Sequence, residues 1–222
     1  HPHRGIETIS YVSRGKMVHR DSLGNEAGIS DGEVQWMNSG SGIMHEEMVP
    51  AAERLLGVQL WLNLPAKDKM SKPSYNSIKN EDIKEIEIEG GKIRLLAGKY
   101  GEHEGYKGDY LSMDYYDIHL NADAEVTLTM EEDDSVMVFT LLGDVYIDGE
   151  HIEEKTAVKL TEGDSLTIKN GNEKAQVLYM NSRALNEPVA WAGPIVMNTQ
   201  EELQKAFLEL RSNTFIKETA EY

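Results

Sequence analysis

The sequence predicts an all-β protein with one short α-helix near its C-terminus. Short runs rich in β-branched and aromatic residues recur along the chain, and Gly and Asp residues separate them at intervals of about ten residues. This spacing is typical of a β-sandwich or a β-barrel. The chain has 222 residues, which is enough for one large domain or two small ones.

The first half of the chain reads as short strands separated by turns. Residues 6–12, I-E-T-I-S-Y-V, combine β-branched and aromatic side chains and predict a strand. Asp31 and Gly32 predict a tight turn, and Val34 and Trp36 then alternate along one face of the next strand. The other strands predicted in this half are residues 16–20, 43–48 and 55–64.

A polar segment, residues 65–85, separates this half from a second set of strands and is the predicted linker. It begins with Pro65 and is interrupted by Pro73. Both halves follow the order strand, glycine turn, strand, acid-Gly-acid, strand, which suggests that one barrel module is duplicated. The strands predicted in the second half are residues 86–88, 92–97, 109–120, 124–130, 135–142, 143–149, 156–160, 166–169 and 175–180. The sequence therefore predicts two domains, residues 1–84 and 85–222.

The tail of the chain departs from the β pattern. Residues 199–211, T-Q-E-E-L-Q-K-A-F-L-E-L-R, predict an amphipathic helix. Thr199 and Glu202 have the spacing of a capping box, in which each side chain accepts a backbone hydrogen bond from the other residue. The apolar face consists of Leu203, Phe207 and Leu210. We expect this face to pack against a barrel, and binding of a partner protein is the alternative.

Composition narrows the classes of function. The formal net charge is −17, with 39 acidic and 22 basic residues, which disfavours direct binding to nucleic acid or to anionic membranes. The sequence contains no cysteine, so disulfides, thiolate metal sites and cysteine nucleophiles are excluded. The lack of cysteine favours a reducing compartment such as the cytoplasm. The sequence contains no run of about 18 apolar residues, so it predicts no transmembrane helix.

Two short motifs predict a metal site. His1 and His3 are two residues apart, as are His45 and Glu47, so each pair would point to one face of a strand. If the two strands pair, three imidazoles and one carboxylate come together and leave room for further ligands. Such a donor set suits Fe(II), Mn, Ni, Cu or Zn. The alternative is that the histidine pair is an ordinary polar edge of a strand.

Longer stretches carry a family resemblance. H-P-H-R-G-I-E-T-I-S-Y-V, H-R-D-S-L-G-N, G-E-V-Q-W-M-N-S-G-S-G-I-M-H-E-E-M and W-A-G-P-I-V-M-N-T-Q-E-E-L resemble the pirin family of the cupin superfamily. The resemblance implies two cupin-type β-barrels (a bicupin) with one metal, usually iron, in the N-terminal barrel. The family's ligand pattern falls on His1, His3, His45 and Glu47, and Glu46 occupies its variable position.

The resemblance also bears on the domains and on two departures from the family pattern. Residues 1–84 would form the metal-binding barrel, whose strands upstream of the H-P-H motif are missing from this sequence. Residues 85–222 would form a second barrel without metal ligands, together with the C-terminal helix. Pirins commonly carry an arginine where this chain has Ser41, so a less basic pocket rim is expected. Among the other histidines, His19 is a candidate for a residue that does not bind the metal itself but contacts one of its ligands.

The resemblance implies two functions of different classes. Some microbial pirins are similar to quercetin 2,3-dioxygenases, which open flavonols with O₂. Such a reaction here would use Fe(II), with Glu47 as general base and a flavonol-like substrate held in an apolar pocket. Candidates for that pocket are Met17, Trp36, Met37 and Met44, although the barrel core is their ordinary role. Other pirins are similar to iron-binding, redox-sensing proteins that regulate transcription or a metabolic enzyme through protein–protein contacts.

Overall fold

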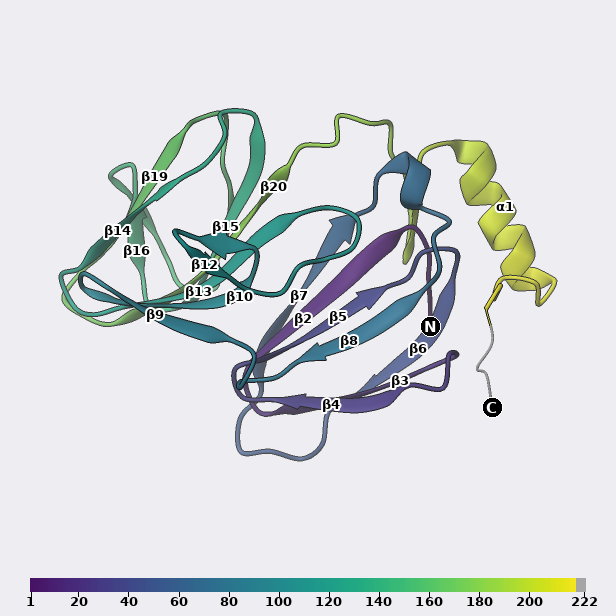
Figure 1. Ribbon diagram of the computed structural model, residues 1–222, viewed down its shortest axis with the longest axis horizontal. Helices are drawn as coiled ribbons and strands as arrows, with labels where there is room; N and C mark the ends of the chain where they lie inside the picture. The colour runs from purple at the N-terminus through teal and green to yellow at the C-terminus, as the bar shows by residue number, and fades with distance from the viewer. Residues whose placement is uncertain (219–222) are drawn as a thin grey trace. The chain divides into compact units, whose positions relative to one another are not determined.

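The computed structural model describes residues 1–218 and consists mainly of antiparallel strands (Figure 1). The chain divides into two compact units. The first contains His1–Asn80 together with the segment that starts at Leu185, and the second is Glu81–Ala184. No helix among the described residues is long and apolar enough to span a membrane.

The first unit contains two four-stranded antiparallel sheets. One has the order β7-β2-β5-β8, made of Leu56–Asn63, Ile6–Arg14, Glu33–Asn38 and Ser74–Ile78. The other has the order β1-β6-β3-β4, made of Pro2–His3, Ile43–Met48, Lys16–Asp21 and Glu26–Ser30. Strand β4 contacts β2, β5 and β8, so the two sheets pack together. The central strands β2 and β5 are buried along almost their whole length, as expected for a barrel wall.

The predicted linker contains ordered structure of the first unit. A 3₁₀ turn, η1 (Ala66–Asp68), is followed by β8, which pairs with β5 so that Ile78 lies opposite Val34. Strand β8 is an edge strand with the polar sequence S-Y-N-S-I, and it follows Pro73. Its polar residues are the reason why the sequence pattern did not predict a strand here. The prediction of a linker over 65–85 was therefore wrong for most of its length, and the boundary between the units falls after Asn80.

The second unit contains a six-stranded and a four-stranded antiparallel sheet. The larger has the order β18-β15-β20-β13-β10-β9, made of Ala157–Lys159, Asp134–Leu142, Ala175–Arg183, Met113–Leu120, Gly91–Ala97 and Lys84–Ile88. The smaller has the order β14-β19-β16-β17, made of Glu125–Thr129, Ser165–Asn170, Val145–Ile147 and Glu150–Ile152. A short hairpin joins β11 (Lys99–Tyr100) to β12 (His103–Glu104).

Alternating side chains place the core of the second unit between its sheets. Strands β14 and β19 alternate exposed and buried residues, so Val126 and Ile168 point inward while Thr127 and Thr167 face solvent. The inward residues join an apolar cluster that includes Ile93, Ile118, Val138 and Val177. Such alternation is expected of antiparallel sheets with one face in water.

The C-terminal segment adds a hairpin and the only helix of the described residues that is longer than a single turn. Strands β21 (Ala190–Ala192) and β22 (Ile195–Met197) precede α1 (Gln200–Arg211), which packs on them through Leu203 and Ala206. The capping box is confirmed, because Thr199 Oγ1 accepts from the Glu202 amide and the Glu202 carboxylate accepts from the Thr199 amide. The prediction grouped this helix with the second barrel, whereas in the structure it packs with the first unit.

A buried lysine provides a pH-dependent test of this packing. Lys69 is 1% exposed, and its Nζ donates to the carbonyls of Gly5 and Val196 and to Asn63 Oδ1. Burial lowers the pKa of Lys69 to about 8, although Glu187 and Glu202 oppose the shift. Between pH 8 and 10.5 the unfolded chain would hold this proton and the folded chain would not. The free energy of unfolding therefore gains about 1.4 kcal/mol per pH unit across this window from Lys69.

We expect Lys69→Met to remove this gain. Denaturant unfolding at several pH values should show wild type becoming more stable relative to Lys69→Met as the pH rises from 8 to 10.5. Lys72→Met, at an exposed lysine three residues away, is the control and should track wild type. Parallel pH profiles for wild type and Lys69→Met would contradict the expected linkage.

Candidate metal centre

The two histidines at the start of the sequence lie beside the strand that carries His45 (Figure 1). Strand β1 pairs with β6, with His3 opposite Ile43. The pairing continues to His1, since the His1 nitrogen donates to the His45 carbonyl and the His45 amide donates to the His1 carbonyl. Opposite residues of an antiparallel pair share a face, as do residues two apart. The pairing therefore turns the three imidazoles to one side.

The three rings converge on one point. His1 Nε2 lies 3.0 Å from His3 Nε2 and 2.9 Å from His45 Nε2. Metal–imidazole bonds of about 2.1 Å at right angles put ligand nitrogens roughly 3 Å apart, so these spacings match those of cis ligands on one ion. Together the three residues form one of two groups of His and Glu in the described residues whose ligand atoms lie within 4.8 Å of one another.

Two of the rings present lone pairs to this point. Burial is the main cause that lowers the pKa of His3 to about 4 and that of His45 to about 3, so both are neutral near pH 7. His3 Nδ1 donates to the Pro194 carbonyl at 3.2 Å, which leaves His3 Nε2 without a proton. Neutral imidazoles with exposed lone pairs are the form that metals bind. The donor set therefore fits a divalent metal.

Glu47 lies beside this cluster, at the side of His45. It belongs to the second group, with His19 and His45, rather than to the group that contains His1 and His3. The four predicted residues are thus brought into two overlapping groups that share His45. Glu47 is partly buried, and its carboxylate faces the barrel interior, whereas the intervening Glu46 is exposed on the other side of β6.

Neutral amides hold the Glu47 carboxylate. Glu47 Oε1 accepts from Gln35 Nε2 at 2.7 Å and from Gln59 Nε2 at 3.0 Å. Trp61 Nε1 donates to Gln59 Oε1 and fixes the orientation of that amide. Sequence reasoning missed both glutamines, although Gln35 shares a strand face with Met37 in Q-W-M and Gln59 shares one with Trp61 in V-Q-L-W.

Aromatic rings flank the cluster on two sides. Trp61 meets His3 edge-on, with ring centroids 5.2 Å apart, and is 40% exposed. Tyr75 stacks on His19 with centroids 4.3 Å apart, and burial raises its pKa to about 12, so it stays protonated. Of these two rings, Trp61 is the more exposed.

Two of the four residues predicted to form an apolar pocket share a strand face with residues of the site, and two do not. Trp36 and Met37 are fully buried in β5, and Met44 is exposed on the face of β6 opposite to His45. Met17, two residues before His19 on β3, shares a strand face with the cluster. Met37 does so too, because it lies two residues after Gln35 and opposite Tyr75. Ser41 is 5% exposed, and the less basic pocket rim stays a prediction.

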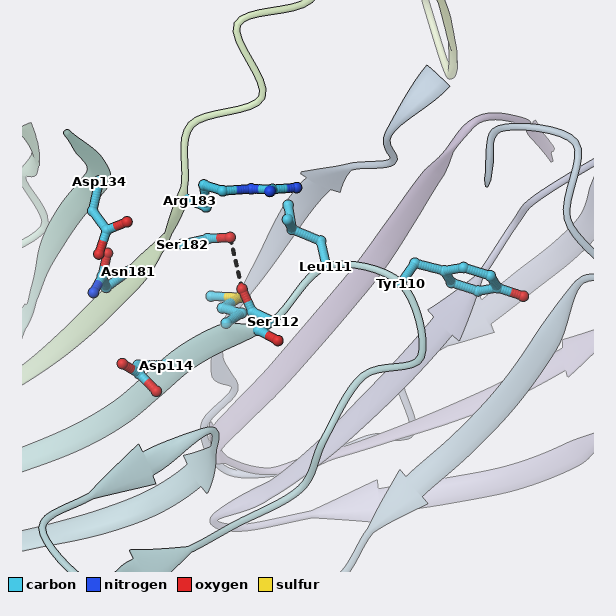
Figure 2. A pocket seen from close by; sticks show the side chains of 9 residues that line it. Tyr110, Leu111, Ser112, Asp114, Asp134, Asn181, Ser182 and Arg183 are labelled. Carbon is cyan, nitrogen blue, oxygen red and sulfur yellow. Dashed lines mark hydrogen bonds between the residues drawn. The ribbon is translucent and has the colours of Figure 1, made fainter. Parts of the chain in front are cut away.

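The second unit has a different kind of hollow (Figure 2). A cavity of about 450 Å³ opens at the ends of β13, β15 and β20, and it is lined by Tyr110, Leu111, Ser112, Met113, Asp114, Asp134, Asn181, Ser182 and Arg183. No histidine is among these residues. Both candidate metal groups found in residues 1–218 include His45 of the first unit, and a second barrel without metal ligands stays a prediction.

Two family models match the chain, one in each half. Residues 1–62 match the family described as Pirin, and residues 115–216 match the Pirin C-terminal cupin domain. Human pirin is 36% identical over 222 residues, an alignment that covers 96% of this chain and 75% of human pirin.

Solved structures show the same fold. A crystal structure of quercetin 2,3-dioxygenase from Acinetobacter baumannii is 34% identical and has a TM-score of 0.89, covering 97% of this chain and 77% of that one. The bacterial pirin YhhW from Escherichia coli, solved in complex with nickel(II), has a TM-score of 0.67 at 24% identity, covers 83% of this chain and 76% of its own, and supports the fold alone. The predicted all-β fold of two cupin barrels with a short C-terminal helix is therefore confirmed, and the chain belongs to the pirin family.

Proposed function

We propose that this protein is a metal-dependent dioxygenase that opens flavonols such as quercetin with O₂. His1, His3, His45 and Glu47 would hold the metal, with Fe(II) expected and Mn, Ni, Cu or Zn as alternatives. The observation that carries the proposal is the convergence of three imidazoles, in which His1 Nε2 lies 3.0 Å from His3 Nε2 and 2.9 Å from His45 Nε2. The likeness to a quercetin 2,3-dioxygenase structure supports the choice of substrate class.

A bound divalent metal would supply Lewis acidity and open positions for small ligands. The protein side chains have separate tasks. Glu47 would accept the proton of the flavonol 3-hydroxyl, and the amides of Gln35 and Gln59 would keep its carboxylate aimed at that proton. Trp61 would stack on or flank the flavonol rings at the mouth of the barrel and help to exclude water.

The activity test follows quercetin directly. Protein loaded with Fe(II), and separately with each alternative metal, should remove the flavonol absorbance band while oxygen is consumed. Free metal at the same concentration is the control. Absence of turnover above that control, across several flavonols and metals, would sink the proposal and favour a regulator that acts through protein contacts.

The variant Glu47→Gln tests whether Glu47 acts as the general base or as a metal ligand. The amide keeps the size of the side chain and its contacts to Gln35 and Gln59 but cannot take a proton, so we expect kcat to fall about 10²–10⁴-fold. Metal content should be measured on the same samples. An inactive variant that retains its metal supports the base, whereas loss of the metal supports ligation by Glu47. Glu46→Gln is the matched control, because Glu46 is exposed on the opposite face of β6 and should leave activity unchanged.

A further inference from the structure

Two buried residues behind His45 form a chain of hydrogen bonds that leads away from the candidate metal. We propose that Asp21 and His19 are positioning residues, which fix the ring orientation and the tautomer of His45 so that its Nε2 lone pair faces the metal position. The proposal rests on His45 being a ligand in the proposed function. It goes further by assigning a task to two residues outside the ligand pattern.

Strand register brings these residues together. In the pairing of β3 with β6, Asp21 lies opposite His45 and His19 lies opposite Glu47. The motif H-x-D on β3 therefore faces the motif H-x-E on β6, with all four side chains on the same face of the pair. The side chains of His19 and Asp21 are both completely buried, so water does not compete for their hydrogen bonds.

Asp21 is the fixed end of the chain. Its carboxylate accepts from the Leu23 amide at 2.9 Å, from the Asn25 amide at 3.1 Å and from Asn25 Nδ2 at 2.9 Å. Burial would raise the pKa of Asp21, but the hydrogen bonds from His19, Asn25 and Leu23 hold it below its usual value. Asp21 is therefore an ionised acceptor, and its position is set by the turn that follows β3.

The proton positions then follow in order along the chain. His19 Nε2 lies 2.9 Å from Asp21 Oδ2, and because the carboxylate only accepts, His19 Nε2 carries the hydrogen. In a neutral His19 this leaves a lone pair on Nδ1, which faces His45 Nδ1 at 3.5 Å, the long end of hydrogen-bond range. His45 Nδ1 must then be the donor, and His45 Nε2, 2.9 Å from His1 Nε2, is left with its lone pair.

Packing holds the intermediate ring in place. His19 stacks on Tyr75 at an interplanar angle of 18°, and its ring centroid lies 5.4 Å from that of His45. Outer partners of this kind set the tautomer of a ligating histidine, and their loss typically costs 10–100-fold in metal affinity. A stacked, fully buried ring has little freedom to adopt another orientation.

The second unit contains a matched pair for comparison. On β13, His119 Nε2 lies 2.8 Å from Asp117 Oδ2, again with one residue between the histidine and the aspartate. The His119 side chain is 37% exposed and belongs to neither candidate metal group of the described residues. Asp117→Asn therefore changes the same kind of hydrogen bond without touching the candidate metal centre.

The main test replaces Asp21 with its amide, Asp21→Asn. The new amide would donate to His19 Nε2, move the His19 hydrogen to Nδ1 and force the hydrogen of His45 onto Nε2, where it blocks the metal position. Long-range ¹H–¹⁵N spectra of the metal-free protein should show His45 protonated at Nδ1 in wild type and at Nε2 in Asp21→Asn. Nickel(II) affinity, measured by competition with a chromophoric chelator, should fall 10–100-fold. Asp117→Asn should change neither readout.

Two replacements of His19 guard against a loss of folding in Asp21→Asn. His19→Phe keeps a ring against Tyr75 but offers no acceptor, so nickel(II) binding should weaken. His19→Asn places an oxygen near the position of Nδ1 and should restore much of the affinity lost in His19→Phe. An unchanged His45 tautomer in Asp21→Asn, or equal nickel affinity in wild type and His19→Phe, would overturn the proposal. Neither readout depends on turnover, so an inactive protein that binds nickel would refute the dioxygenase and leave this inference standing.

Discussion

His45→Ala is expected to weaken nickel(II) binding by at least about a hundredfold, the largest effect of any single ligand. His45 is the one residue shared by both groups of candidate ligands, and its Nε2 contacts that of His1. Structural zinc sites of four ligands bind with about 10–16 kcal/mol, so each ligand there accounts for several kcal/mol on average. Chelator competition gives the affinity directly.

Thermal unfolding provides a second measurement of the same loss. A metal held at a hundred times its dissociation constant stabilises the folded state by about 2.7 kcal/mol. Wild type should therefore show a raised Tm with nickel(II), and His45→Ala should show almost none. His151→Ala is the control, because His151 is exposed and contacts Asp144 in the second unit. Retention of wild-type affinity by His45→Ala would show that the ligand set is wrong.

The sequence predicted that His1, His3 and His45 lie together, and the structure confirms this proximity, while their role as metal ligands stays a prediction. Residues two apart on a strand share a face, so H-P-H predicts that His1 and His3 point to one side, and H-E-E predicts the same of His45 and Glu47. That the two strands are neighbours followed from the family resemblance, and the observed pairing of β1 with β6 agrees with it. Strand alternation and glycine turns likewise predicted the all-β fold without tertiary information.

Other parts of the site depend on tertiary contacts that no local pattern carries. Gln35 and Gln59 reach Glu47 from β5 and β7. The position of a single glutamine in a strand does not predict which side chain its amide will bind. Trp36 was proposed as a pocket residue and Trp61 was overlooked, although both lie in strands. Their roles differ because Trp36 is buried and donates to Glu7, whereas Trp61 shares a strand face with Gln59.

The allocation of the C-terminal helix failed for the same reason. The helix was predicted correctly from its capping box and apolar face, and that face packs on the neighbouring hairpin of β21 and β22. A residue that ties this segment to the first unit, Arg4, lies at the other end of the sequence. Arg4, only 2% exposed, binds Glu209 of α1 at 2.8 Å and donates to the Phe215 carbonyl at 2.9 Å. The sequence around either residue does not predict an ion pair between Arg4 and Glu209.

Arg4→Met is expected to destabilise the first unit by about 3–5 kcal/mol. The guanidinium also donates to the Ser41 carbonyl at 2.7 Å and lies 4.1 Å from the centre of the Phe215 ring. Methionine keeps the apolar contact but leaves Glu209 without its buried partner and two carbonyls without donors, and breaking a buried ion pair from one side costs about this much. Denaturant unfolding followed by a probe in the first unit measures the loss.

Lys217→Met is the matched control, since Lys217 binds the same Glu209 carboxylate at 3.0 Å but is 35% exposed. A partly solvated pair contributes about 0–1 kcal/mol, so this variant should remain close to wild type. Arg4 also follows His3, whose Nδ1 is held by the Pro194 carbonyl of the same C-terminal segment. Loosening that segment should therefore free the His3 ring, so Arg4→Met should weaken nickel(II) binding and Lys217→Met should not. Equal stability of the two variants would mean that the ion pair, although buried, does not hold the segment to the barrel.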